Sequence, residues 1–211
     1  MLKVSAINIE KLKKGELQNE LPEFFELKNC IENNEWHNND SVFDHTLSVL
    51  EELDKLRLKN INNKINSYLN QKIDTHTRQE ALFLGTLFHD IAKNDVLLKD
   101  GDKTSCPKHE EVGSKKAQII LNRLDLSDQE KAIVVKIIKY HGKIHIILSR
   151  QNIKIDEQYK RFKSEHHDIF IELILLAMAD TLGSQLQENN PNKFNFRIDF
   201  YKHIIDNSFE L

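Results

Sequence analysis

Acidic and histidine side chains interrupt two apolar segments of this 211-residue chain. His89 and Asp90 end one segment, and Asp180 directly follows Ala177-Met178-Ala179 in another. Removing an ionised carboxylate from water costs several kcal/mol unless the charge is compensated. Asp180 is therefore expected to be hydrogen-bonded, paired with a basic side chain, or bound to a metal ion.

Three further histidines occupy comparable positions. We expect His45 and His141 on the apolar sides of two helices, and His109 just before a third helix. With the three residues above they form a candidate metal site of nitrogen and oxygen ligands. Such ligands without thiolate suit Mn, Fe, Co, Ni, Zn or Mg. The competing interpretation is a set of hydrogen-bonded core histidines beside a solvated aspartate.

The remaining histidines have weaker claims to chemistry. His37, in Glu35-Trp36-His37-Asn38, is left open at this point. The others lie in polar surroundings, before the second apolar segment or near the end of the chain, and we expect surface or capping roles for them. These are His76, His145, His166, His167 and His203.

Helices must bring the candidate ligands together, and hydrophobic spacing predicts them. A helix beginning at Ser41 would carry His45, because Ser41 and Asp44 are spaced nearly as in a capping box. Gly85, one turn before His89, leaves room for the close approach of another helix. Ile169–Ala179 contains one polar residue in 11, which predicts a central buried helix. The first predicted helix runs from Ser41 with apolar spacing through Leu56, and the others span about 78–93, 110–124, 127–142, 168–187 and 194–209.

The connecting segments are predicted as follows. Residues 21–30 resemble a short helix, 33–34 and 38–40 loops, and 143–155 a loop or a helix end. With only 6 Gly and 3 Pro, few loops can need a positive φ, so the predicted fold class is all-α. We expect one domain over 21–190, a lead-in segment over 1–20, and a helical extension over 191–211 packed on the domain.

Composition excludes several classes of protein. Hydrophobic residues make up 39% and charged residues 30%, and the formal net charge is −3. This balance excludes a disordered tail, a disulfide scaffold and a membrane protein. A general DNA-coating protein would carry a large positive excess. Only two cysteines, Cys30 and Cys106, occur, and no signal-peptide-like start is present, so the expected location is cytoplasmic.

The ordered set His45, His89-Asp90 and Asp180 resembles the H…HD…D signature of the HD-domain phosphohydrolase superfamily. Flanking blocks are similar to one branch, the HD domain of bacterial tRNA nucleotidyltransferases (CCA-adding enzymes). These blocks are Leu21-Pro22-Glu23, Glu35-Trp36-His37, Val42-Phe43-Asp44-His45-Thr46-Leu47, His109-Glu110-Glu111-Val112-Gly113 and Leu175-Leu176-Ala177-Met178-Ala179-Asp180-Thr181-Leu182-Gly183. Ala92 and Lys108 depart from glycines that are common at those positions, and no nucleotidyltransferase head is found, so we expect no CCA addition by this chain alone.

The resemblance implies a helical bundle that binds one or two divalent ions. His45, His89, Asp90 and Asp180 would be ligands, and His109 and His141 match positions that supply a second metal in some HD enzymes. Asp90 would orient the ions and accept a proton. Lys93 would neutralise charge on a phosphate, the alternative being a lysine that interacts with a helix dipole. His37 would contact substrate at the rim.

The implied reaction is hydrolysis of a phosphoester by attack of a metal-bound water. We expect a nucleotide or RNA terminus as substrate, in the manner of a 2′,3′-cyclic phosphodiesterase or phosphatase. The alternatives are a hydrolase of small free or signalling nucleotides, favoured by the lack of a strong basic groove in the sequence, and a non-catalytic module that assists a separate RNA-processing enzyme. Oligomeric state and metal identity are left open.

Overall fold

A helix buried on nearly all sides occupies the centre of the molecule. The structure is a computed structural model that describes residues 1–58, 63–149 and 154–207. In α11 (Phe170–Gly183), every residue except Asp180 and Leu182 is buried. The long apolar sequence explains this position, because a helix that is apolar all round must be covered all round. The predicted central helix and the all-α fold class are confirmed.

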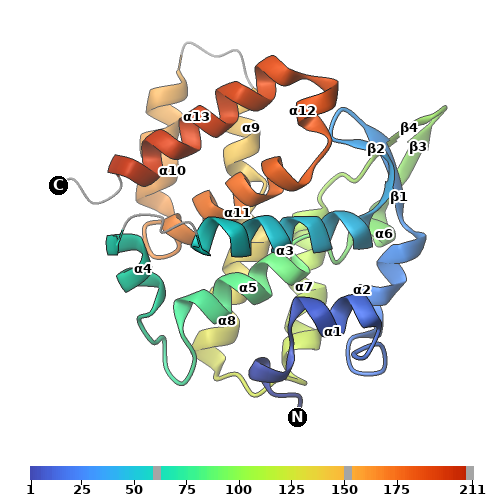
Figure 1. Cartoon of the computed structure of the whole chain (residues 1–211), viewed down its shortest axis with the longest axis vertical. Helices are drawn as coiled ribbons and strands as arrows, with labels where there is room; N and C mark the ends of the chain where they lie inside the picture. Colours follow the sequence, from blue (N-terminus) through green and yellow to red (C-terminus); the bar gives the residue numbers. More distant parts are fainter. Residues whose placement is uncertain (59–62, 150–153, 208–211) are drawn as a thin grey trace.

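Four further helices carry or support the candidate ligands. These are α3 (Val42–Leu58), α5 (Arg78–Phe88), α7 (His109–Leu121) and α8 (Asp128–Tyr140). α3 packs along α11, while α5 contacts both α3 and α8, and α8 packs on α7 (Figure 1). At Gly85 the two helices α5 and α8 meet closely, since an added Cβ would lie 2.5 Å from Ile137 Cγ2. The predicted close approach at this glycine is confirmed.

Side-chain caps fix where several of these helices begin. The hydroxyl of Ser41 accepts from the N–H of Asp44 and donates to its carboxylate, so α3 starts as predicted. Ser127 and Glu130 form a capping box at the start of α8, as their spacing predicted. Thr77 and Glu80 form another at the start of α5. Each cap satisfies backbone N–H groups that the first turn leaves unpaired.

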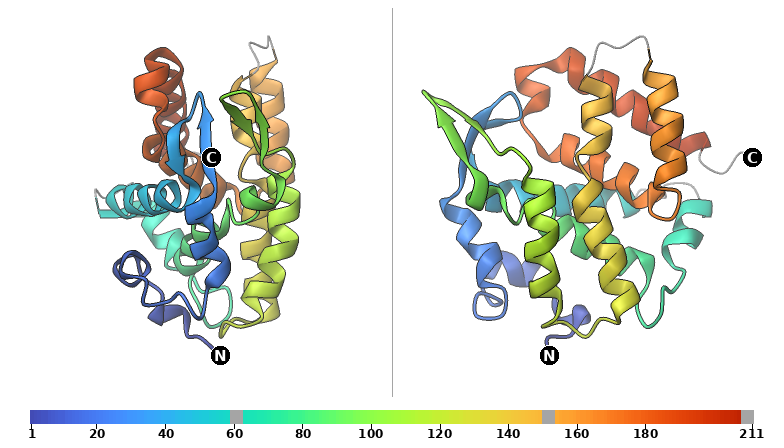
Figure 2. Two further views of the ribbon diagram at one scale, coloured as in Figure 1. Left: turned by 90° about the vertical axis from the view of Figure 1, so that its right-hand side faces the viewer. Right: turned by 180° about the vertical axis from the view of Figure 1, so that it is seen from behind.

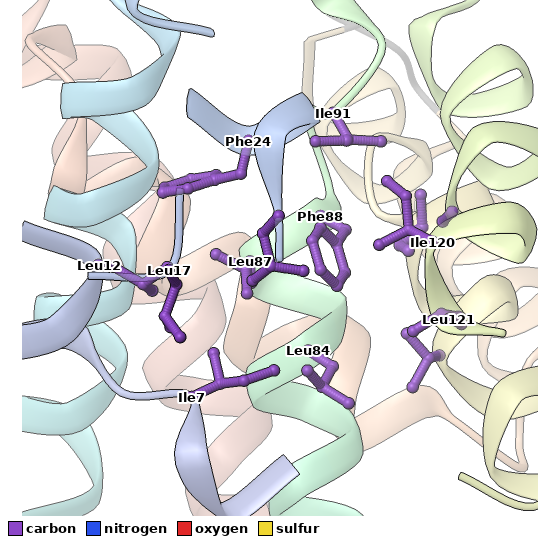
Figure 3. Packing of buried hydrophobic residues seen from close by; sticks show 14 of the residues in the cluster. Ile7, Leu12, Leu17, Phe24, Leu84, Leu87, Phe88, Ile91, Ile120 and Leu121 are labelled. Carbon is purple, nitrogen blue, oxygen red and sulfur yellow. The ribbon is translucent and has the colours of Figure 1, made fainter. Parts of the chain in front are cut away.

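The N-terminal segment joins the core. It contains a 3-10 turn, η1 (Val4–Ala6), then α1 (Ile9–Lys14), α2 (Pro22–Glu26) and η2 (Leu27–Asn29). Figure 3 shows Leu84, Leu87 and Phe88 of α5 between Leu12 and Leu17 on one side and Ile120 and Leu121 of α7 on the other. Residues 1–20 therefore contribute buried side chains to the same core, while the proposed division of the chain at residues 20 and 190 remains a prediction.

A second group of helices covers the other side of α11. α13 (Pro191–Asn207) packs against α11, and α12 (Leu186–Asn189) connects the two. α9 (Lys143–Ser149) contacts both α11 and α10 (Ile155–Glu165), and α4 (Asn63–Leu69) lies against α5. Sequence analysis did not predict α4 and α10. Among the described residues, no helix combines the length and apolar character needed to span a bilayer.

Two β-hairpins lie side by side at one edge of the bundle (Figure 2). The first pairs β1 (Ile31–Asn34) with β2 (His37–Ser41), and the second pairs β3 (Leu98–Asp100) with β4 (Lys103–Ser105). The N–H of Asn33 donates to Thr104 Oγ1 at 2.8 Å, which links the two hairpins. The loops predicted at 33–34 and 38–40 were therefore wrong, because tertiary contacts hold these polar residues in strands.

Two helix predictions also need correction. The helix predicted over 78–93 ends at Phe88, and a turn over residues 89–92 separates it from α6 (Lys93–Val96). The segment 143–155, predicted as a loop or helix end, contains α9 and the start of α10, whereas residues 150–153 lie outside the described residues. The predicted end of the last helix, residues 208–209, also lies outside them.

Candidate metal centre

The six predicted ligands converge from five places in the chain. His45 lies in the first turn of α3 and Asp180 near the end of α11. His89 and His141 follow directly on the last residues of α5 and α8, Asp90 lies in the turn after His89, and His109 is the first residue of α7. His45, His89, Asp90 and His141 are between 1% and 4% exposed, so the cluster lies beneath the molecular surface.

Each oxygen of Asp90 faces a different pair of imidazoles. Its Oδ2 lies 3.1 Å from His89 Nε2 and 3.7 Å from His45 Nε2. Its Oδ1 lies 3.3 Å from His109 Nε2 and 3.8 Å from His141 Nε2. Two groups with metal-ligating atoms within 4.8 Å of one another therefore share this carboxylate: His45 with His89, and His109 with His141.

Asp180 lies beside the first of these groups. Its Oδ1 lies 2.9 Å from His45 Nε2 and 4.0 Å from His89 Nε2. The other oxygen, Oδ2, lies 3.1 Å from Nε2 of His145 in α9. Asp180 thus contacts the predicted ligand His45 and also His145, for which a surface or capping role was expected.

Backbone carbonyls fix the orientation of three imidazoles. The Nδ1 atoms of His89, His109 and His141 lie 2.7 Å, 2.8 Å and 2.7 Å from the carbonyl oxygens of Thr86, Cys106 and Ile138. A neutral imidazole that donates from Nδ1 keeps its Nε2 lone pair for a metal ion. All three Nε2 atoms point into the cluster.

The donor set fits a divalent cation. Within the described part of the chain, His89 Nε2 is buried without a hydrogen-bond partner, although it lies close to Asp90. Such an atom is costly unless an ion or ordered water satisfies it. Four imidazoles and two carboxylates suit Mn, Fe, Co, Ni, Zn or Mg and do not select one of them.

Electrostatics keeps the carboxylates charged. Burial raises the pKa of Asp90, but His89 and Lys93 outweigh it, and the net pKa lies well below the ordinary value. The pKa of Asp180 is also well below its ordinary value, because His145 and His45 outweigh burial. Burial, His89 and His109 together lower the pKa of His141 to about 3. An ionised carboxylate and a neutral imidazole are the forms that bind metals.

A pocket of about 380 Å³ opens onto this cluster. Asp90, His109, His141 and Asp180 line it together with His37 and Lys93. Five acidic residues and one lysine line the pocket, so it is strongly negative before any cation enters. The acidic residues are Glu32, Glu35, Asp90, Glu110 and Asp180.

The lysine and His37 both lie beside a carboxylate that sequence analysis missed. Lys93 begins α6 and its Nζ lies 2.9 Å from Asp90 Oδ2 and 2.6 Å from Glu32 Oε2. His37 Nε2 lies 3.4 Å from the same oxygen of Glu32. Lys93 was expected to lie on the same helix side as His89 and Asp90; a turn follows Phe88 instead of a helix, and Lys93 nevertheless lies beside Asp90. Glu32 is a strand residue of β1, so helical spacing gave no signal for it.

Other histidines differ from the surface and capping roles predicted for them. His145 lines the pocket beside Asp180, and its position four residues after His141 was the available signal. It was missed because α9 was expected to be a loop. His166 is 6% exposed and packs on Tyr140. His76 is largely buried against Glu130, whereas His167 and His203 are exposed as predicted.

The two departures from the superfamily pattern have different structural consequences. Lys108 precedes α7 with φ 60°, in the left-handed region that favours glycine. A side chain there costs about 1–2 kcal/mol. Ala92 has φ −107°, which needs no glycine. The backbone conformation therefore favours glycine at position 108 but not at position 92. Neither departure removes a candidate ligand.

Similar curated proteins are bifunctional uridylyltransferase/uridylyl-removing enzymes. The one from Legionella pneumophila (strain Lens) is 28% identical over 157 residues, which are 74% of this chain and 16% of the relative. The one from Chromobacterium violaceum is 26% identical over 189 residues, 89% of this chain and 21% of the relative. The chain thus spans about a fifth or less of their length.

These relatives support the superfamily but not the finer resemblance to CCA-adding enzymes. Residues 42–184, more than half of the chain, match the HD domain family. The match begins at the first residue of α3 and ends one residue beyond α11, so it includes all six predicted ligands. The chain therefore belongs to the HD domain family.

Proposed function

We propose that the chain is a metal-dependent phosphohydrolase that binds two divalent cations. The observation that carries this proposal is the position of Asp90, whose two oxygens face two different pairs of imidazoles. A carboxylate in that position can bridge two cations. The proposed ligands are His45, His89, Asp90 and Asp180 for one cation, and Asp90, His109 and His141 for the other.

The chain's own residues supply orientation and charge. When bound, divalent cations would provide an activated water and a positive charge for the phosphate oxygens. Asp90 would orient the attacking water and accept its proton. Lys93 Nζ, held between Glu32 and Asp90, would neutralise charge that develops on the phosphate. His37 lines the same pocket and would contact the substrate.

The substrate class proposed first is a nucleotide or an RNA terminus, including 2′,3′-cyclic phosphates. A hollow of about 650 Å³ shares Glu110 and Ile146 with the metal pocket and favours an RNA end. Four lysines line it: Lys108, Lys115, Lys139 and Lys143. Sequence analysis saw no strong basic groove because these lysines are dispersed between residues 108 and 143.

A second candidate is the removal of a nucleotidyl group or the hydrolysis of a small free nucleotide. The similar curated proteins are named for uridylyl removal, which favours a uridylyl ester as substrate. The pocket volume of about 380 Å³ also suits a ligand of mononucleotide size. This candidate and the RNA terminus require the same metal chemistry but differ in the use of the lysine-lined hollow.

The test is hydrolysis by the purified chain with added Mn²⁺, Ni²⁺, Co²⁺, Zn²⁺ or Mg²⁺. The substrates are 2′,3′-cyclic and linear mononucleotides, a dinucleoside polyphosphate, a uridylyl ester and a short RNA with a terminal phosphate. We expect turnover that chelation with EDTA abolishes and that Asp90→Ala lacks. Absence of turnover with every cation and substrate would contradict the proposed function and favour a non-catalytic module.

The lysine-lined hollow gives a prediction that separates the two substrate classes. Lys139→Ala combined with Lys143→Ala should raise KM for the short RNA. It should leave KM for mononucleotides unchanged, because mononucleotides do not reach these residues. Steady-state kinetics at two salt concentrations measures this. Lys99→Ala with Lys202→Ala, two exposed lysines outside the hollow, is the matched control. Equal KM changes for RNA and mononucleotide would exclude the RNA-end assignment.

A further inference from the structure

We propose that Arg197 and His145 form a positioning chain that fixes which oxygen of Asp180 faces the metal centre. The inference rests on the proposed metal site and deepens it. Arg197 lies in α13, outside residues 42–184 that match the HD domain family, and His145 lies in α9. Neither touches the Asp90 carboxylate that carries the proposed function, so they would act through Asp180 alone.

The first contact of this positioning chain joins Arg197 to His145. Arg197 Nη1 lies 2.9 Å from His145 Nδ1, and Arg197 Nη2 donates to the backbone carbonyl of His145 at 3.1 Å. A guanidinium only donates hydrogen bonds and does not lose its charge in proteins. His145 Nδ1 must therefore be the acceptor, and the proton of the neutral ring lies on Nε2.

The second link runs from histidine to carboxylate. His145 Nε2 lies 3.1 Å from Asp180 Oδ2, so a proton on this nitrogen is placed to be donated to that oxygen. Oδ1 is then the oxygen left for the cluster, 2.9 Å from His45 Nε2. The hydrogen bonds thus fix the rotation of the carboxylate about its Cβ–Cγ bond. Partners of this kind around metal ligands set ligand orientation and basicity.

The surroundings of Arg197 indicate a polar role rather than space filling. Its side chain is 0% exposed, and burial of a guanidinium is costly unless its donors are used. The guanidinium lies over the ring of Trp36, 4.9 Å from its centroid, which holds its plane toward His145. Tyr201 OH, 3.2 Å from the same Nδ1, is placed as a weaker second donor.

The experiment measures cation affinity and coordination instead of turnover. Mn²⁺ and Co²⁺ are titrated into wild type, His145→Leu, His145→Gln and Arg197→Met, and the visible absorption of bound Co²⁺ reports its coordination. His145→Leu and Arg197→Met should bind about 10- to 100-fold more weakly, with an altered Co²⁺ spectrum. His145→Gln should retain affinity close to wild type, because its amide can still donate to Asp180. Lys202→Met, an exposed lysine on the same helix as Arg197, is the matched control and should not differ from wild type.

The outcomes distinguish this inference from the proposed function. Far-UV circular dichroism and thermal melting first show whether each variant folds; if Arg197→Met does not, the two His145 variants decide. Wild type that binds no cation would overturn the metal site and the positioning chain together. Wild type that binds cations, with His145→Leu equal to it in affinity and in Co²⁺ spectrum, would overturn the positioning chain only.

Discussion

Asp90 is the residue on which the two halves of the candidate site depend. His45 and His89 lie near one of its oxygens, and His109 and His141 near the other. Replacing Asp90 therefore affects both proposed cation positions, whereas replacing His109 affects one. Each side of this carboxylate has two imidazoles, and Asp180 lies on the side of His45 and His89 only.

Because Asp90 is shared by both proposed cation positions and His109 belongs to one, variants of these two residues should differ in metal content. Wild type loaded with Mn²⁺ and desalted should hold two ions per chain, His109→Ala one, and Asp90→Asn fewer than one. Elemental analysis by mass spectrometry gives the ratios, and activity of Asp90→Asn should fall on the order of 100-fold or more. His203→Ala, at an exposed position on α13, is the control. Loss of both ions in His109→Ala would contradict two separable positions.

At the scale of elements, prediction from sequence succeeded where local chemistry determines structure. Ser41 and Ser127 begin helices through their own hydrogen bonds, and the apolar run before Asp180 can only be buried. The hairpin of β1 and β2 was missed because its residues, mainly Asn and Asp, are not typical of strands. That hairpin carries Glu32 and His37, so the part of the pocket that depends on it could not be derived from helical spacing.

The contact between α5 and α8 gives a prediction with a built-in control. Gly85→Ala should destabilise the fold by about 1–3 kcal/mol, because the new Cβ would lie 2.5 Å from Ile137 Cγ2 and force the helices apart. Gly113→Ala, in α7, meets its nearest atoms at 3.6–3.7 Å and should be neutral or stabilise by up to about 1 kcal/mol. Urea unfolding measures both, and equal effects would show that helix propensity rather than packing decides.

The start of α8 predicts a pH dependence of stability. Glu130 is 0% exposed and accepts hydrogen bonds from the N–H groups of Thr75, His76 and Ser127. Burial raises its pKa, but these hydrogen bonds lower it from 4.5 to about 2. Because the folded-state pKa lies below that of the unfolded chain, the stabilisation is complete above about pH 4.5 and is lost as pH falls toward 2.

Glu130→Gln should therefore lower the free energy of unfolding at pH 7 by about 2 kcal/mol. The difference from wild type should shrink as pH falls from 4.5 to 2, since protonation removes the same charge from the wild-type side chain. Urea titrations across this range test the prediction. Glu20→Gln, an exposed glutamate, should follow the wild-type curve at every pH. A difference that is constant over the range would mean that the charge of Glu130 is not involved.

At the scale of the whole molecule, the candidate site holds together elements that are far apart in the sequence. Its proposed ligands lie between residues 45 and 180, on α3, α7 and α11 and directly after α5 and α8. Four of them line a pocket with five carboxylates, which repel one another when no cation compensates them, and with one lysine. Both facts couple cation binding to the stability of the entire fold.

Binding to the folded chain alone raises its stability by RT ln(1 + [cation]/Kd), about 2.7 kcal/mol at 100 times Kd. For a chain of this length we expect Mn²⁺ to raise Tm by about 5–10 °C, increasing with concentration. Differential scanning fluorimetry measures the shift, with NaCl at equal ionic strength as the control for screening. Asp90→Asn should melt at a temperature independent of Mn²⁺, and below the metal-free wild type, because the ionised Asp90 carboxylate, whose pKa lies well below its ordinary value, stabilises the fold. A wild-type Tm unchanged by every divalent cation would mean that the histidines and aspartates cluster for another reason, since ligands drawn from five places in the fold cannot bind an ion without stabilising it.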